Sequence, residues 1–248
     1  MRYALISDIH GNLPALDAVL QNIADRELDD AVYHLGDLVG YSPWPNEVVA
    51  LLRARSIAGV AGNYDSTVAA DYKHCGCRSE SARQEELAHL SYAWTREHVS
   101  AETKAFLGAL PFRLDLKPLG GHVAGPVVTL VHATPVSNLV YVTVDRSDEF
   151  LTRKAGQAGL VAGDVLCFGH THAPWQRVVG GVTFVNTGSV GRPKDGDARA
   201  GYVVIDVSGS GVGVEFVRVA YDVERAVRGV ADAGLPVEFG DFLRSGGR

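Results

Sequence analysis

Short apolar runs alternate with segments of helical periodicity through the first quarter of the chain. Residues 3–7 are mostly apolar, and residues 14–24 follow with apolar side chains at helical spacing. An apolar run at residues 31–35, a helical segment at about residues 46–55 and another run at residues 57–61 continue the alternation. Strands that alternate with helices are typical of a mostly parallel sheet, so the pattern predicts an α/β fold.

Strands dominate the second half of the chain. Residues 66–80 lack periodicity, whereas residues 81–98 and 101–110 have the spacing of helices. One further helix is expected at about residues 148–158, and Gly180-Gly181 predicts a two-residue hairpin turn. The expected strands are residues 112–116, 127–131, 165–168, 176–179, 182–185, 202–207 and 212–219, with a longer hairpin turn at residues 208–211.

The C-terminal segment predicts one more helix and then a loose end. Residues 223–233 follow the helix-capping residue Asp222 and end at Gly234, and the tail from Phe242 is expected to fray. With 248 residues, of which 46% are hydrophobic, the chain can bury one large core. We therefore expect a single domain over residues 1–248, with residues 66–110 as a cap over the functional site.

Charge and cysteine content narrow the function classes. The net charge of −6 argues against binding of long nucleic acids, which usually requires a basic face. No apolar run reaches the length of a membrane span and no signal peptide is recognisable, so a cytoplasmic protein is expected. The three cysteines favour a reduced compartment. His74-Cys75-Gly76-Cys77 lacks the second pair that a zinc knuckle needs.

Metal-ligand side chains directly follow the short apolar runs. Each motif alone is common, because a Gly-Asp pair is often just a turn and a pair of histidines often only packs. Their shared position at strand ends, where open α/β sheets build their sites, favours a two-metal hydrolytic site. The seven side chains are Asp8, His10, Asp37, Asn63, His132, His170 and His172.

This series of motifs resembles that of the calcineurin-like metallophosphoesterases, which is D-x-H, G-D, G-N-H-D, a lone H and G-H-x-H. The resemblance covers about residues 1–205, and residues 7–12 and 186–189 are similar to the compact bacterial and archaeal phosphodiesterase branch. It implies a four-layer αββα sandwich. It also implies hydrolysis of a small phosphodiester, for example a nucleotide-derived one, or of a phosphomonoester, by a metal-bound hydroxide.

The resemblance divides the ligands between two divalent ions. Metal 1 would take Asp8, His10 and His172, metal 2 would take Asn63, His132 and His170, and Asp37 would bridge them. Mixed nitrogen and oxygen ligands suit Mn²⁺ first, with Fe²⁺ or Zn²⁺ as alternatives. The implied partner is a small phosphorylated substrate, with neither a long nucleic acid nor a membrane.

Tyr64 departs from the family pattern. Gly62-Asn63-Tyr64-Asp65 offers a phenol where many members have a histidine, and a phenol donates a hydrogen bond without bringing positive charge. His74 on the adjacent loop is a possible substitute. The departure also keeps open a metal-binding interaction scaffold with little catalysis, whereas the complete ligand set favours an enzyme. We expect Asp37, Asn63, Tyr64 and Asp65 to be its catalytic residues.

Two basic residues follow the last motif. Arg192 and Lys194 suit a second phosphate or the leaving group, or they pair with Asp195 and Asp197 at the surface. Residues 40–45 form either an aromatic wall of the substrate pocket or a plain packed turn.

Overall fold

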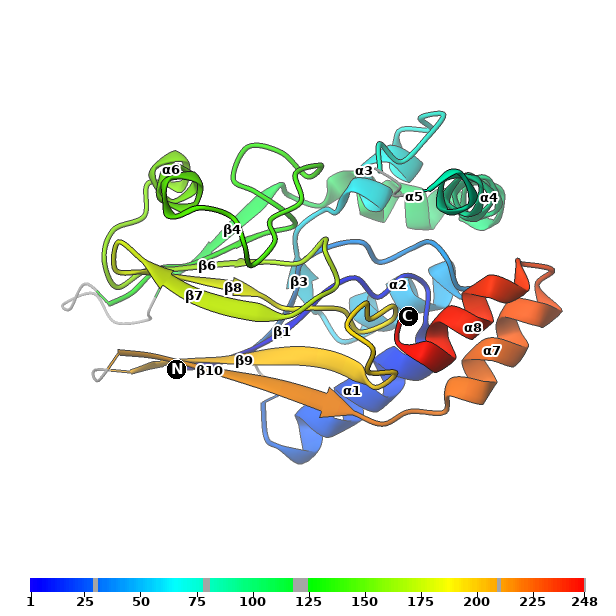
Figure 1. Cartoon of the computed structure of the whole chain (residues 1–248). Coiled ribbons are helices and arrows are strands. Elements are labelled where there is room, and N and C mark those ends of the chain that lie inside the picture. Colours follow the sequence, from blue (N-terminus) through cyan, green and yellow to red (C-terminus); the bar gives the residue numbers. More distant parts are fainter. Residues whose placement is uncertain (29–30, 78–80, 118–124, 209–210, 248) are drawn as a thin grey trace.

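Two five-stranded sheets form the centre of the molecule (Figure 1). The computed structural model describes residues 1–28, 31–77, 81–117, 125–208 and 211–247. The first sheet has the order β10-β9-β1-β2-β3, with bounds Gly211–Val219, Ala200–Ser208, Arg2–Ile6, Val32–His34 and Ala58–Gly59. The second has the order β4-β5-β6-β8-β7, with bounds Arg113–Leu116, Val128–Val131, Val165–Phe168, Val182–Asn186 and Trp175–Val179. Both sheets mix parallel and antiparallel pairs.

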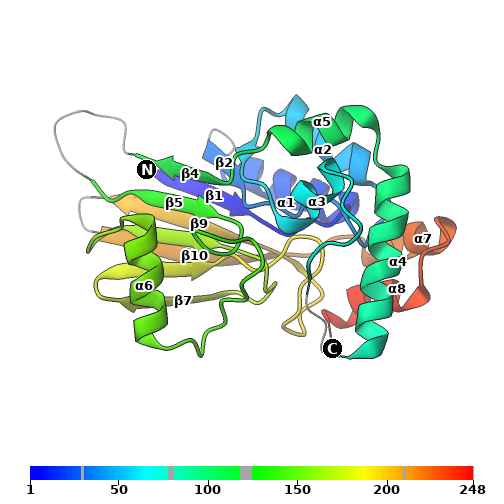
Figure 2. The ribbon, with the colours of Figure 1, turned by 90° about the horizontal axis from the view of Figure 1, so that it is seen from above.

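Helices cover the outer faces of the two sheets. On the first sheet lie α1, Leu13–Asp25, and α2, Pro45–Ala54, and on the second lies α6, Asp148–Ala158 (Figure 2). The remaining helices gather at one end of the sheets. They are α3, Asn63–Ala69; α4, Ala82–His98; α5, Ala101–Ala109; α7, Val223–Asp232; and α8, Val237–Ser245.

Alternation along the central strands explains the four layers. On β1, Tyr3 and Leu5 pack between the two sheets, whereas Ala4 and Ile6 face the core shared with α1 and α2. The same alternation on β6 sends Cys167 between the sheets and Phe168 towards α6. Because both faces of these strands are buried, they read as continuous apolar runs. The predicted αββα sandwich is confirmed.

The predicted two-residue turn also forms. Gly180 and Gly181 connect β7 to β8 with φ of 58° and 81°, and Val179 pairs with Val182 across the turn. Such left-handed angles at both turn positions favour glycine. Strands β9 and β10 pair from Ser208 and Gly211 onwards, and residues 209–210 of this predicted turn lie outside the described residues.

The C-terminal tail is a helix, so the expectation of a frayed end from Phe242 was wrong. Phe239 and Leu243 of α8 are buried against α7. The Gly196 N–H donates to the Gly246 carbonyl at 2.8 Å, which ties the end of the chain to a loop of the core. The helical spacing of these two apolar residues was the missed signal.

The cysteines also differ from the expectation of a reduced set. Cys75 and Cys77 form a disulfide, and Cys167 is free and buried. This pairing also leaves no thiolate at residues 75 and 77 for a zinc knuckle. Among the helices of the described segments, none combines the length and apolar character that a bilayer span requires.

Candidate metal centre

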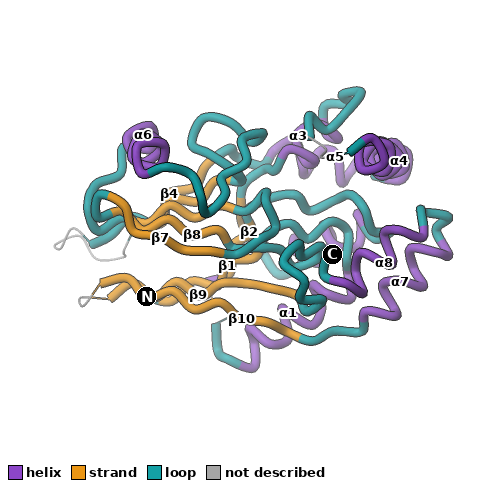
Figure 3. Tube along the Cα trace, in the orientation of Figure 1, coloured by secondary structure: helices purple, strands orange, loops and turns teal. Residues whose placement is uncertain are grey.

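The predicted ligands lie in segments that directly follow strands of the two sheets. Figure 3 shows the strands in orange and the loops between the elements in teal. Asp8 and His10 follow β1, Asp37 follows β2, and Asn63 begins α3 just after β3. The second sheet contributes His132 after β5, and His170 and His172 after β6. All seven side chains are buried. Each sheet therefore supplies part of the centre from the carboxyl ends of its strands, as open α/β sheets do.

Five of these residues have a left-handed backbone. The φ angles are 51° at Asp8, 50° at His10, 53° at Asp37, 66° at His170 and 61° at His172. Left-handed angles cost energy for residues other than glycine and cluster at functional sites. The neighbouring turns are also crowded, because a Cβ atom on Gly62 would overlap the Asp37 carboxylate. The loops are thus shaped to aim these side chains at one point.

Asp8, His10 and His172 form the first group that could hold a metal ion. His172 Nε2 lies 3.2 Å from Asp8 Oδ1 and 3.2 Å from His10 Nε2. His10 Nε2 lies 3.9 Å from the same Asp8 oxygen. Three potential ligand atoms thus face a common point.

Asp37, His132 and His170 form the second group. His132 Nε2 lies 3.5 Å from Asp37 Oδ2, 3.1 Å from His170 Nδ1 and 3.1 Å from Asn63 Oδ1. The Asp37 Oδ2 atom is also 3.8 Å from His10 Nε2 of the first group. Asp37 therefore stands between the two groups, in the position of a shared carboxylate.

Backbone carbonyl groups orient three of the imidazoles. The Nδ1 atom of His10 lies 3.1 Å from the Val39 carbonyl oxygen. Nδ1 of His132 lies 2.8 Å from the Leu35 carbonyl oxygen, and Nδ1 of His172 lies 2.6 Å from that of Arg192. A proton on Nδ1 leaves the Nε2 lone pair to face the centre, which is how metal-binding histidines are usually held.

An orphaned polar atom indicates that a cation fits this centre. Asp8 Oδ1, which faces His172 Nε2, is buried without a hydrogen-bond partner among the described residues. Buried polar atoms are normally satisfied, and a cation would satisfy this oxygen. Imidazole, carboxylate and amide ligands together suit transition-metal ions.

Burial sets the protonation of the centre. It lowers the pKa of His172 to about 4 and the pKa values of His10 and His170 well below their usual range, so these rings are neutral near pH 7. Burial raises the pKa of Asp37 to about 8. Burial also acts to raise the pKa of Asp8, but the neighbouring histidines outweigh it and the net shift is downward. A divalent cation would favour the ionised form of Asp37.

Asp65 points at the backbone and away from the cavity. Its carboxylate accepts hydrogen bonds from the N–H groups of Asp37 at 2.8 Å, Leu38 at 2.9 Å and Gly62 at 2.9 Å. These bonds fix the turn that carries Asp37 against the start of α3.

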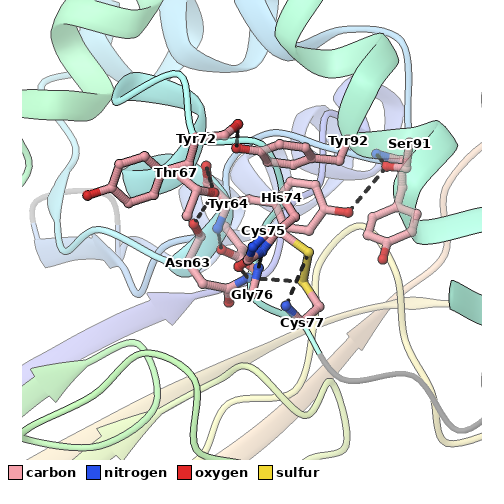
Figure 4. The surroundings of a disulfide bond; sticks show 12 residues. Asn63, Tyr64, Thr67, Tyr72, His74, Cys75, Gly76, Cys77, Ser91 and Tyr92 are labelled. Atoms are coloured by element: carbon pink, nitrogen blue, oxygen red, sulfur yellow. Dashed lines mark hydrogen bonds between the residues drawn. A yellow bond between two sulfur atoms is a disulfide. The ribbon is translucent and has the colours of Figure 1, made fainter.

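Tyr64 lines the cavity, but its hydroxyl group already has a protein neighbour. It donates to Ser91 Oγ of α4 at 3.4 Å (Figure 4), while the Tyr64 N–H donates to Asp37 Oδ1 at 2.9 Å. The ring packs edge-on against His10, with centroids 5.5 Å apart.

The disulfide segment contacts Asn63. The Asn63 Nδ2 group donates to the Cys75 carbonyl at 3.4 Å and to Cys77 Sγ at 3.3 Å (Figure 4). These contacts leave Oδ1 to face His132. His74 is exposed, accepts from the Gly76 N–H at 3.2 Å and does not line the cavity, so it does not stand in for a histidine at position 64.

A cavity of about 350 Å³ opens over the centre. Tyr41, from the expected aromatic segment, lines it, whereas Trp44 of the same segment packs with α7 and α8. Helix α4 contributes Leu87 to one wall, and α8 contributes a second wall that the sequence patterns missed. The residues of that wall are Glu238, Phe239 and Phe242.

Arg192 and Lys194, the two basic residues that follow the last motif, both line this cavity. Arg192 stacks between Tyr41 and Phe242. Asp195 pairs with Arg218, and Asp197 with Arg199 at 2.6 Å. Surface pairing with these acids therefore does not account for Arg192.

Comparison with known proteins decides the family. The calcineurin-like phosphoesterase superfamily domain matches residues 1–210. The chain belongs to this family. An uncharacterized protein of Methanocaldococcus jannaschii, MJ0912, is 30% identical over 261 residues, covering 97% of this chain and 96% of its own length.

Two solved structures are similar to this chain over nearly its whole length. A metallophosphoesterase from Sphaerobacter thermophilus is 27% identical, covers 99% of each chain and has a TM-score of 0.76. The hypothetical protein PH1004 from Pyrococcus horikoshii shares the fold with a TM-score of 0.81 at 21% identity, covering 100% of this chain and 98% of its own. The prokaryotic relationship predicted from the motifs is confirmed.

Proposed function

We propose that this phosphoesterase uses two divalent ions to hydrolyse a small phosphodiester, such as a nucleotide-derived one, or a phosphomonoester. The observation that carries the proposal is the position of Asp37 Oδ2, which lies 3.8 Å from His10 Nε2 and 3.5 Å from His132 Nε2. One carboxylate between two ligand groups can hold two cations about 3.5 to 4 Å apart.

The ligands divide as the motifs imply. Asp8, His10 and His172 would hold one ion, and Asn63, His132 and His170 the other, with Asp37 shared. Mn²⁺ is our first choice, with Fe²⁺ and Zn²⁺ as alternatives. Bound ions would supply Lewis acidity and an activated water at the reacting phosphorus.

The chain's own residues then orient and bind the substrate. Buried and neutral, His10 and His172 keep their Nε2 atoms available as ligands, because backbone carbonyls hold their Nδ1 protons. We assign Asp65 a positioning role through the Asp37 turn. Arg192 and Lys194 would bind phosphate oxygens from the cavity wall.

Tyr64 is proposed to influence the leaving group. Its hydroxyl group can release Ser91 and donate to a leaving oxygen, but burial raises its pKa well above the usual range, so it remains a neutral donor. We also propose that residues 1–248 act as one domain in which residues 66–110 form a cap over the cavity.

Hydrolysis of bis(p-nitrophenyl) phosphate by the purified protein in excess Mn²⁺ tests the proposal. Elemental analysis of the loaded protein should give two metal ions per chain, and Asp37→Asn should lower both metal content and turnover. A protein that binds both ions without turnover of any phosphate ester tested would instead be the scaffold that Tyr64 left open.

A further inference from the structure

Arg192 carries its charge at the cavity wall without an anionic partner. Its guanidinium carbon lies 4.0 Å from the centroid of the Tyr41 ring and 3.8 Å from that of Phe242. Among the described residues, no carboxylate lies within 4.0 Å of this guanidinium. The cavity acid Glu238 is paired with Arg83. The two aromatic contacts stabilise the cation but do not neutralise it.

The guanidinium is held close to the metal centre. It lies between the two rings, so its N–H edge, and not its flat faces, is left to meet a ligand. The Tyr41 ring is in turn 5.1 Å from the His10 ring, centroid to centroid. The two rings cover the flat faces of the guanidinium, so water reaches its charge mainly from the edge. A poorly hydrated cation with free N–H donors gains most from an anionic ligand.

The charge balance of the cavity points to an anion beyond the reacting phosphoryl group. Two divalent ions on a ligand set with only two carboxylates, Asp8 and Asp37, already meet the single charge of a phosphodiester. Arg192 adds a further positive charge, separated from His10 of the centre by the Tyr41 ring. We propose that Arg192 binds a second phosphoryl group next to the reacting one, so that the substrate is an ester containing a diphosphate. This inference rests on the proposed function.

Helix α8 positions this arginine. Phe242 comes from a helix beyond the matched residues 1–210, and it packs on the Arg192 side chain. The backbone bond from Gly196 to Gly246 joins α8 to the same loop. A Cβ atom on Gly247 would lie only 2.7 Å from the Pro193 carbonyl oxygen, so the two segments are in close contact. Phe242 is thus a positioning residue for substrate selection, through Arg192.

Binding of two nucleotides to the Mn²⁺-loaded protein tests the inference, with chromatography after each titration to verify that the nucleotide is still intact. AMP offers one phosphoryl group, whereas α,β-methylene-ADP offers two and resists cleavage between them. By isothermal titration calorimetry, the diphosphate analogue should bind at least about tenfold tighter than AMP, the expected effect of a charge-assisted hydrogen bond. Arg192→Gln should bring the ratio of the two affinities close to one. Phe242→Leu, which keeps an apolar side chain but removes the ring, should lower the ratio by about threefold or more.

A matched control and an independent assay separate the possible failures. Val237 lies on the exposed face of α8, with 68% of its surface accessible, so Val237→Ala should leave the ratio unchanged. An unchanged ratio of the two affinities in Arg192→Gln would overturn the inference. If both affinities fall equally, Arg192 binds the reacting phosphoryl group instead. Bis(p-nitrophenyl) phosphate, which has one phosphoryl group, separately tests the proposed hydrolysis.

Discussion

Replacing Asp65 by asparagine should distinguish a positioning residue from a catalytic one. The carboxylate accepts three backbone hydrogen bonds, two at Oδ2 from Asp37 and Gly62 and one at Oδ1 from Leu38. An amide keeps one acceptor oxygen, so at least one buried N–H group loses its partner and faces an NH₂ group instead. An unsatisfied buried donor costs about 1–3 kcal/mol. We expect Asp65→Asn to lower the free energy of unfolding by that amount.

The same substitution should weaken metal binding, because the Asp37 turn loses its support. Urea unfolding of the metal-free protein measures the stability, and calorimetric titration with Mn²⁺ measures the affinity. Asp241→Asn is a matched control on the surface of α8, where the Asp241 side chain is 65% exposed. A surface change of this kind should stay within about 0.5 kcal/mol.

Two outcomes would refute this reasoning. If Asp65→Asn unfolds at the same urea concentration as the wild type and binds Mn²⁺ equally well, the three hydrogen bonds do not fix the turn. If it loses turnover while stability and metal affinity are unchanged, Asp65 takes part in the chemistry, as the sequence pattern suggested. Asp65→Ala removes all three acceptor contacts, and its cost approaches the total stability of a typical domain, about 5–15 kcal/mol. Asparagine is therefore the more informative change.

Four further results are expected. Asp37→Asn should leave less than about a tenth of wild-type turnover in excess Mn²⁺, because both ions lose a ligand; higher residual activity would contradict the shared-carboxylate mechanism. Since burial raises the pKa of Asp37 to about 8, Mn²⁺ affinity should rise with pH up to that value, by about tenfold per pH unit. Calorimetry in buffers of different ionisation enthalpy would show the released proton, and a pH-independent affinity would contradict it. Burial lowers the pKa of His34 to about 3, so its unfolded form binds more protons and stability falls as pH drops from about 6.5. Between pH 6.5 and 5, the free energy of unfolding of His34→Leu should fall by about 2 kcal/mol less than that of the wild type. Urea unfolding of both proteins at the two pH values measures this difference. Tyr64→His should make turnover less dependent on leaving-group acidity across a series of phosphodiesters. Equal slopes for the two proteins would mean that position 64 does not assist the leaving group.

Much of the fold, and the meeting of the seven candidate ligand side chains in one place, could be predicted because their signals are local. The residue that follows a buried strand is fixed in space by that strand, so Asp8 after β1 and Asp37 after β2 had to lie at the same edge of one sheet. Alternating burial on β1 likewise follows from the strand itself. The alternation of apolar residues and the position of each motif directly after a strand were therefore sufficient for these predictions.

The role of Asp65 lies beyond such local signals. A carboxylate two residues after the ligand Asn63 resembles a catalytic acid, and the family pattern reinforces that interpretation. Its partners, however, are backbone N–H groups of Asp37 and Leu38, 28 and 27 residues earlier in the chain. Backbone donors have no sequence signature, so only the folded geometry can assign this carboxylate to the turn.

The two aromatic contacts of Arg192 join residues that are far apart in the sequence. Tyr41 follows β2 and Phe242 is near the C-terminus, yet both rings lie about 4 Å from one guanidinium carbon. Helix α8 could have been predicted from the spacing of Phe239 and Leu243. The position where it packs could not, because that position depends on the path of the chain through α7. Since the proposed metal ligands follow strands and Phe242 comes from α8, changes in α8 could alter substrate preference without changing the candidate metal centre. Comparing nucleotide affinity and metal affinity in Phe242→Leu would reveal whether the two functions are separable in this way.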